Sequence, residues 1–464
     1  MPHRRENGPI EAAAPSSPIA LPESSEAPPA SDSALRTGFA AIGLLLVLAS
    51  LLLLLTDAAA VPTHYVPASV GGWPNWLSGP LRGIGSELHG TGFETLMLVM
   101  CAGYLLVLAG ARRLPLWLLA GSIVLAHLLL LLGPPLISQD VFGYLAFARM
   151  GALHGLDPYT HVAAEASGDP VFAFVGWPFK HSPYGPIYTL ASYGAAPLGA
   201  AGGLWAMKCV ASLASLGAVA LSAGAASRLG RSRRQAAAFI GLNPVLLVLA
   251  VGGAHNDTLL ILLLSVTLFV TAGANPSYRS GAWALAIAVG VKVTAGLTLP
   301  FLVLAPAERS RRVGVAVAGI LGLLVVAAVG VIGFGPHALG FFGAVGEQQR
   351  LIATHSIPAE TARLLSLDGT PGWWRGIFWA GFLAVLLTCL WRTAKGADWR
   401  DGAAWSTLAL LASTAWLLPW YAIWALPLAA VSGDRRLRAV VLLACAYAVL
   451  IHLPLADPLL SPRG

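Results

Sequence analysis

The chain has few charged residues, and this shortage is the first limit on its class. Only 11% of its 464 residues are Asp, Glu, Lys or Arg, while 57% are hydrophobic. Soluble domains carry about 25% charged residues, so an ordinary water-soluble globular protein is excluded. Apolar stretches of ~18 or more residues with few charges recur along the chain, as expected of helices that cross a membrane.

Lysine is especially scarce, and the net charge of +7 comes mainly from arginine. The arginines stand in short clusters between apolar stretches, where basic residues orient transmembrane helices. The positive charge is therefore explained by membrane topology, and we expect no nucleic-acid partner. The chain has only four lysines: Lys180, Lys208, Lys292 and Lys395.

Cysteine is also rare, with four residues that each lie in a separate apolar stretch. From this distribution we predict no disulfide framework, and the cysteines show no metal-ligand spacing. We see no internal repeat.

The arginine clusters predict the path of the chain across the bilayer. Residues 1–34 are rich in Pro, Ser, Ala and Glu and are predicted to be a disordered cytoplasmic tail. Residues 35–464 are expected to form one all-α, multi-pass membrane domain of about 11–13 transmembrane helices. In this path the N-terminus is cytoplasmic, whereas the segment 134–185 and the C-terminus are external.

Two apolar stretches lie between basic clusters that both belong to the cytoplasmic side. Residues 281–306 and 402–432 are each too short to make two full crossings. We therefore expect broken hairpins, with Lys292 near the tip of the first and LLPWY (417–421) at the outer turn of the second. Irregular backbone at that depth is tolerated only where it is buried in protein or lines a wet cavity.

Polar side chains are predicted to converge on the external face. Asp140 follows a long apolar stretch, and an acid at a bilayer edge is costly, which favours a functional role. Asp140 is a candidate catalytic base, and helix capping is an alternative compatible with that role. Lys292 has no evident compensating charge, so a lipid phosphate is its expected partner. Lys180 and His181 stand next to a stiff turn, SPYGP (182–186), and are candidates for holding the same phosphate.

The sequence GGAHND (252–257) places three polar residues at the mouth of a predicted helix. Capping of that helix and substrate binding are about equally supported. A His–Asp pair is a weak indication of a metal, and we predict neither a metal nor a cofactor. The predicted substrate-binding residues are Tyr144, Tyr184, His255, Asn256, Asp257, Trp420 and Tyr421.

Five sequences in order carry a resemblance to a known family: SQDVFGYLAFARMGALHGLDPY, SPYGPIYTLAS, GLNPVLLVLAVGGAHNDTLLI, VKVTAGLTLPFLV and LPWYAIWALPL. Together they resemble the polyprenol-phosphomannose-dependent α-1,6-mannosyltransferases of bacterial lipomannan assembly, which belong to the GT-C superfamily of multi-pass glycosyltransferases. The resemblance implies a GT-C-like helical bundle in the plasma membrane, with external loops forming the active site.

The resemblance also implies roles for substrates and residues. Asp140 matches the external catalytic aspartate, the donor would be polyprenyl-phosphate-mannose, and the acceptor would be a hydroxyl of a glycolipid or oligosaccharide. Inversion would give an α-linked product, with α-1,6 linkage expected. Many GT-C enzymes carry this aspartate in the first external loop, whereas the predicted path puts Asp140 in the second. The superfamily's common second acid has three candidates: Asp157, Glu165 and Asp169.

Two other functions fit the same features. A lipid-linked sugar flippase would also use broken helices and an intramembrane lysine. A GT-C enzyme could also use another polyprenyl-phosphate sugar, such as arabinose or glucose. Transporters often have paired halves and polar residues near the midplane, whereas this chain has no repeat and gathers its polar residues at one face. These differences favour the transferase.

Overall fold

The computed structural model describes residues 30–66, 73–85, 87–88 and 91–451. These residues form helices joined by loops and contain no strand. Five of the helices are long and apolar enough to cross a membrane, or six if the bent pair Arg233–Gly241 and Val245–Val251 is one span. Shorter apolar helices add to the bundle. The prediction of an all-α polytopic membrane protein is confirmed.

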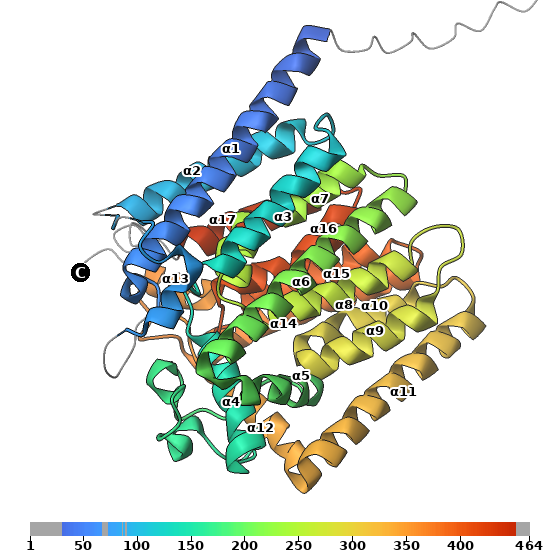
Figure 1. Cartoon of the computed structure of the whole chain (residues 1–464). Helices are drawn as coiled ribbons and strands as arrows, with labels where there is room; N and C mark the ends of the chain where they lie inside the picture. The colour runs from blue at the N-terminus through green and yellow to red at the C-terminus, as the bar shows by residue number, and fades with distance from the viewer. Residues whose placement is uncertain (1–29, 67–72, 86, 89–90, 452–464) are drawn as a thin grey trace, which may run out of the picture.

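Helices α1 (Ala30–Ala60), α2 (Gly92–Gly110) and α3 (Leu116–Leu132) line one side of the bundle (Figure 1). α1 and α2 pack so closely that a Cβ at Gly43 would collide with the carbonyl oxygen of Gly103. Small residues at such crossings let backbones approach, which gives membrane helices much of their packing contact. α1 begins at Ala30, inside the stretch predicted as a disordered tail. The rest of that tail lies outside the described residues.

The centre of the bundle is built around the long helix α6 (Gly199–Arg228). The short helix α5 (Pro186–Ser192) and the turn η5 (Tyr193–Leu198) precede it. Polar contacts tie α6 to its neighbours, with His127 Nε2 of α3 2.8 Å from Ser215 Oγ. Helices α7 (Arg233–Gly241), η6 (Val245–Val251, a π-helix) and α8 (Asp257–Val270) continue the chain.

Both predicted helix interruptions are confirmed. Helix α9 (Tyr278–Val291) ends at Lys292, whose backbone is extended at φ −151° and ψ 124°. The chain then continues through η7 (Val293–Thr298) and α10 (Leu299–Leu304). The second interruption, residues 414–418, separates α15 (Trp399–Ser413) from η9 (Pro419–Ala425) and α16 (Leu426–Val431). Pro at the first positions of α10, η9 and α16 suits helix starts, because its missing N–H is not needed there.

The outer helices present apolar side chains away from the bundle. Leu387 of α14 (Gly372–Ala394) is 63% exposed and Ile332 of α11 (Arg309–Phe334) is 86% exposed. Such surfaces suit contact with lipid. The remaining helices include α4 (Asp140–His154), α12 (Gly340–Gln349), α13 (Ile357–Leu364) and α17 (Arg435–Leu450).

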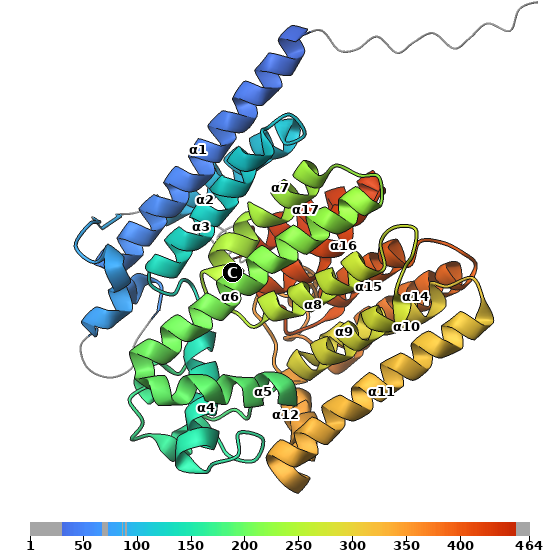
Figure 2. The same ribbon diagram turned by 45° about the vertical axis from the view of Figure 1, so that its right-hand side comes forward.

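Two arginine-bearing turns, marked by Arg112 and Arg312, lie at the end of the bundle away from the candidate site. Arg112, after α2, donates to Gln235 of α7 at 2.8 Å. Arg312 of α11 donates to the carbonyl of Ala394, at the end of α14, at 3.4 Å. Helices α4, α5 and α12 cluster at the opposite end (Figure 2). The predicted membrane path puts these two turns on one side of the membrane and the segment 134–185 on the other.

Candidate active site

Asp140 is the first residue of α4, at the end of the loop that follows α3. The preceding N-cap residue, Gln139, makes no side-chain capping bond. Nδ1 of His255 lies 3.5 Å from Oδ2 of Asp140. The loop is fastened to the GGAHND segment by a hydrogen bond from the Leu136 N–H to the Gly252 carbonyl, at 2.9 Å. Two stretches far apart in the sequence thus hold Asp140 and His255 against each other.

His255 is fully buried, and its ring is held on several sides. It stacks on Trp420 with the ring centroids 3.8 Å apart, and its Nδ1 lies 3.2 Å from the Tyr144 hydroxyl. Behind the ring, a Cβ at Gly253 would lie 2.5 Å from Nε2. Burial lowers the pKa of His255 well below its usual value, and the charge of Lys292 lowers it further. His255 is therefore a neutral ring held in a fixed orientation.

Lys292 is paired, which corrects the expectation that its charge is uncompensated. Its Nζ donates to Oδ1 of Asp257 at 2.7 Å, and Nε1 of Trp424 donates to the same oxygen at 2.6 Å. Nζ also lies 4.4 Å from the ring centroid of Tyr421 and 5.1 Å from that of Trp424. The break in the helix at Lys292 thus brings the ammonium into a cage of one carboxylate and two aromatic faces, which favours a cation.

Asp257 is an acid close enough for its charge to act on Asp140, and it lies outside the 134–185 segment that supplied the three predicted candidates for a second acid. Asp257 starts α8, but its N-cap, Asn256, makes no side-chain capping bond, so the capping interpretation does not hold. The other candidates are engaged elsewhere: Asp169 with Arg149, Asp157 with His337, and Glu165 with the Val162 N–H.

The surroundings of Asp140 favour a proton acceptor near neutral pH. Burial raises the pKa of Asp140 to about 6, and the negative charge of Asp257 contributes in the same direction. The charge of Lys292 and a hydrogen bond with Ser138 oppose the rise. A carboxylate with a pKa near working pH can accept a proton from a hydroxyl as that hydroxyl attacks.

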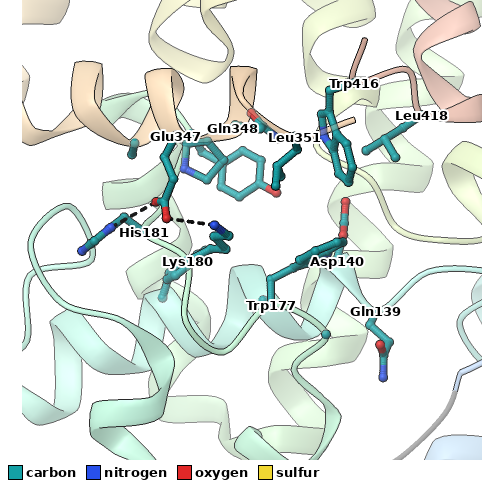
Figure 3. Close-up of a pocket in the computed structure, with 16 residues that line it drawn as sticks. Gln139, Asp140, Trp177, Lys180, His181, Glu347, Gln348, Leu351, Trp416 and Leu418 are labelled. Carbon is teal, nitrogen blue, oxygen red and sulfur yellow. Dashed lines mark hydrogen bonds and ion pairs between the residues drawn. The ribbon is translucent and has the colours of Figure 1, made fainter. Parts of the chain in front are cut away.

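Two pockets meet at this site. The first, of about 620 Å³, contains Asp140 and is also lined by Trp177, Lys180, His181 and Glu347 (Figure 3). The second, of about 590 Å³, contains Lys292. Both are lined by Pro183, Tyr184, Gln348 and Trp416, so the two spaces adjoin.

Lys180 and His181 face the first pocket rather than the Lys292 pocket. Nζ of Lys180 lies 3.0 Å from Oε1 of Glu347, and Nδ1 of His181 lies 3.2 Å from Oε2 (Figure 3). Both predicted phosphate-binding groups thus already have an acidic partner on α12.

The structure brings together most of the residues predicted from the sequence. Tyr144 and Tyr184 pack edge to face, with ring centroids 4.8 Å apart, beside Asp140 and His255. Trp420 supports His255 and lines neither of the two pockets, whereas Tyr421 lines the Lys292 pocket. Asn256 is buried, and its side-chain amide has no hydrogen-bond partner among the described residues.

Several residues of the site were missed. Trp424 follows Tyr421 by three positions in a helical segment, so spacing alone could have placed both beside one ligand. Glu347 is remote in sequence from Lys180, and nothing local signals that pairing. The others missed are Trp177 and Trp416, which line the first pocket, and Tyr188, whose ring packs edge to face on Tyr144 with the centroids 5.4 Å apart. Among the described residues, no group of three or more His, Cys, Asp or Glu could hold a metal ion.

Comparison with known proteins places the chain in a family. Residues 41–308 match the family model described as α-(1→6)-mannopyranosyltransferase, N-terminal domain, and residues 366–462 match the MptB C-terminal domain. The chain is 31% identical over 350 residues to α-(1→6)-mannopyranosyltransferase A of Mycobacterium tuberculosis, covering 68% of this chain and 65% of the relative.

Other relatives match over shorter stretches. The chain is 30% identical over 269 residues to a probable α-(1→6)-mannopyranosyltransferase of Mycolicibacterium smegmatis, covering 50% of this chain and 48% of the relative. It is 31% identical over 181 residues to α-(1→6)-mannopyranosyltransferase A of Corynebacterium glutamicum, covering 38% and 36%. The chain thus spans less than two thirds of the length of these relatives. No solved structure matches. The family match extends over more than half of the chain, so this protein belongs to the α-(1→6)-mannopyranosyltransferase family.

Proposed function

We propose that this protein is an inverting glycosyltransferase that moves a mannosyl residue from polyprenyl-phosphate-mannose to a hydroxyl of a glycolipid or glycan acceptor. The observation that supports it best is the placement of Asp140, a carboxylate of raised pKa, in a pocket that adjoins the pocket of a caged lysine. The names of the relatives support mannose and an α-(1→6) linkage.

Asp140 acts as the general base in this proposal. The acceptor oxygen attacks the anomeric carbon and its proton passes to the Asp140 carboxylate, while the bond from that carbon to the phosphate oxygen breaks and its electron pair leaves with the phosphate. A single displacement inverts the anomeric centre, so a β-linked donor gives an α-linked product. The logic is that of one-step inverting glycosidases, with a sugar hydroxyl in place of water.

Lys292 stabilises the phosphate that departs. An ammonium has three donors, and Asp257 receives one of them, which fixes the direction of the group. The leaving phosphate gains one negative charge as the bond breaks, and a preorganised cation lowers the energy of that change. The second pocket suits a lipid donor because apolar and aromatic groups, including Val293, Leu410 and Trp379, line it beside Lys292.

The proposed topology places this chemistry on the external face of the plasma membrane. Basic residues favour the cytoplasmic side, and the turns that carry Arg112 and Arg312 lie at the end of the bundle opposite α4 and α12. The N-terminus is then cytoplasmic. The C-terminal residues, predicted to be external, lie outside the described residues.

Reconstitution tests the proposal. Purified protein in lipid vesicles receives polyprenyl-phosphate-[¹⁴C]mannose and a synthetic α-mannoside, and both products are measured. We expect equal amounts of extended mannoside, sensitive to α-mannosidase, and free polyprenyl phosphate. Movement of intact donor between leaflets without release of polyprenyl phosphate would show a flippase instead. Preference for an arabinosyl or glucosyl donor would keep the reaction class and change the sugar.

A further inference from the structure

We propose that the pocket containing Asp140 is a subsite for a neutral glycan acceptor, held by Trp177, Trp416 and the Lys180–Glu347–His181 cluster. This inference rests on the proposed function, since it specifies which of the two adjoining pockets receives which substrate. It also gives Lys180 and His181 a role with the acceptor instead of the donor phosphate.

Two tryptophans provide the apolar contact surface of this pocket. The rings of Trp177 and Trp416 meet edge to face, with centroids 5.6 Å apart and planes at 81°. Both line the pocket with Asp140, and Trp177 is 47% exposed (Figure 3). Half-exposed aromatic faces in a pocket with a few polar groups suit the C–H faces of a pyranose ring. The tryptophans come from the loop before α5 and from the break before η9, so they form the surface only in the folded protein.

The ionic cluster provides the polar contacts. A carboxylate offers about four lone-pair positions, and Glu347 uses two of them to accept from Lys180 and His181. The three side chains are each about one third exposed, so a ligand can reach them. Glu347 can accept hydrogen bonds from sugar hydroxyls while Lys180 donates to them.

The charged groups in the two pockets indicate which pocket binds the uncharged acceptor and which binds the donor phosphate. In the first pocket, Glu347 neutralises Lys180, and Asp140 adds a second carboxylate. An anion in this pocket would lie near the carboxylates of both Asp140 and Glu347, and their repulsion makes its binding unfavourable. Lys292 is also paired with a carboxylate, that of Asp257, but Asp257 does not line the second pocket. The second pocket is thus lined by the Lys292 ammonium, aromatic rings and apolar groups, with no carboxylate among the described residues of its lining. The phosphate and its prenyl chain are therefore assigned to the second pocket and the uncharged glycan to the first.

Steady-state kinetics of Trp177→Ala in vesicles test the assignment. We expect the acceptor KM to rise at least tenfold, while the donor KM stays within twofold of wild type. Trp117→Ala is the matched control, because Trp117 on α3 is 75% exposed and lines neither pocket. A rise in donor KM alone, or no change in either KM, would overturn the assignment.

The charge argument has its own test in Glu347→Gln, which leaves Lys180 without its acidic partner. Inorganic phosphate should become a competitive inhibitor against the acceptor in this variant and should not compete with the acceptor in wild type. Competition in wild type would show that the first pocket binds anions and would overturn the inference.

Binding without turnover separates this inference from the proposed function. A neutral α-mannoside oligosaccharide is titrated into the Asp140→Asn protein without donor, and tryptophan fluorescence is followed. Quenching should be saturable, and it should be lost when Trp177→Ala is introduced into the same protein. That result supports the glycan subsite even if no mannosyl transfer is found in any assay. Absence of quenching in the Asp140→Asn protein, when the wild-type protein transfers mannose, would overturn the subsite and leave the proposed function standing.

Discussion

Nζ of Lys292 lies 2.7 Å from Oδ1 of Asp257, and both side chains are nearly excluded from the surface. The lysine comes from the break after α9 and the aspartate from the start of α8, so the pair joins two elements that are separate in sequence. The pair has two consequences. It holds the broken helix in place, and it fixes a cation at the pocket assigned to the donor.

The first prediction concerns removal of one member of this pair. Lys292→Ala should lower the melting temperature in detergent, because it leaves the Asp257 carboxylate buried without its cation, a change that costs about 3–5 kcal/mol in buried pairs. The double variant Lys292→Met, Asp257→Asn should recover most of that stability and still fail to use the donor. Wild-type donor kinetics in the single variant would remove Lys292 from the mechanism.

Asp140→Asn should abolish transfer and leave the protein folded. Asn is nearly the same size as Asp but cannot accept the proton of the acceptor hydroxyl. Radiolabelled product should fall by at least 10²-fold, as for loss of a general base, at an unchanged gel-filtration profile. Glu165→Gln is the control, since Glu165 is an exposed carboxylate of the same external segment. Near-normal turnover by the Asp140 variant would exclude it as the base.

The pKa of Asp140 predicts opposite effects of pH on activity and stability. Because the folded-state pKa is about 6, kcat/KM should fall about tenfold per pH unit below that value as the base becomes protonated. The same carboxyl is less acidic folded than unfolded, so its contribution to stability is full below about pH 4 and is lost as the pH rises through 6. The melting temperature of Asp140→Asn relative to wild type should therefore be higher at pH 8 than at pH 4. A difference that does not change with pH would contradict the raised pKa.

The sequence predicted the local features of the fold better than the contacts between distant segments. Helix breaks at Lys292 and before Pro419 followed from the length of apolar stretches between basic clusters. The meeting of Asp140 with His255 was not specified by either segment alone, since it depends on the Leu136–Gly252 hydrogen bond. Membrane topology predicts which end of the bundle a side chain occupies, but it does not predict which other side chains it contacts there.

Partners of charged groups were the main thing that the sequence did not reveal. The pairing of Lys292 with Asp257 and of Lys180 with Glu347 joins residues far apart in the chain. The free-energy cost of a charged lysine within the membrane indicated that Lys292 needed an anionic partner. That cost did not distinguish a substrate phosphate from an aspartate of the same protein. The candidates for a second acid were taken from the segment around Asp140, whereas the fold also brings Asp257, at the start of α8, close enough for its charge to act on Asp140.

Activity should survive chelation of divalent metals. The proposed leaving group is a monophosphate whose developing charge meets Lys292, so the mechanism assigns no role to a metal ion. Initial rates in vesicles are measured with about 5 mM EDTA, a large excess over trace metal. They should equal the initial rates of the untreated protein. Complete inactivation that is reversed by Mn²⁺ or Mg²⁺ would show that the His255–Asp257 segment binds a metal.

Gly253→Ala tests whether the orientation of His255 matters to the reaction. The added Cβ would lie 2.5 Å from Nε2 and 2.6 Å from Cδ2 of the His255 ring, a distance that the buried ring can relieve only by moving away. Movement would disturb the stack on Trp420 and the approach of Nδ1 to Asp140. We expect kcat to fall more than either KM, because the base loses its fixed neighbour while the walls of the two pockets remain. Gly168→Ala is the matched control, since a Cβ there would meet nothing within 4 Å. If Gly253→Ala retains wild-type kcat while its melting temperature falls, His255 serves packing alone and the orientation of Asp140 depends on other contacts.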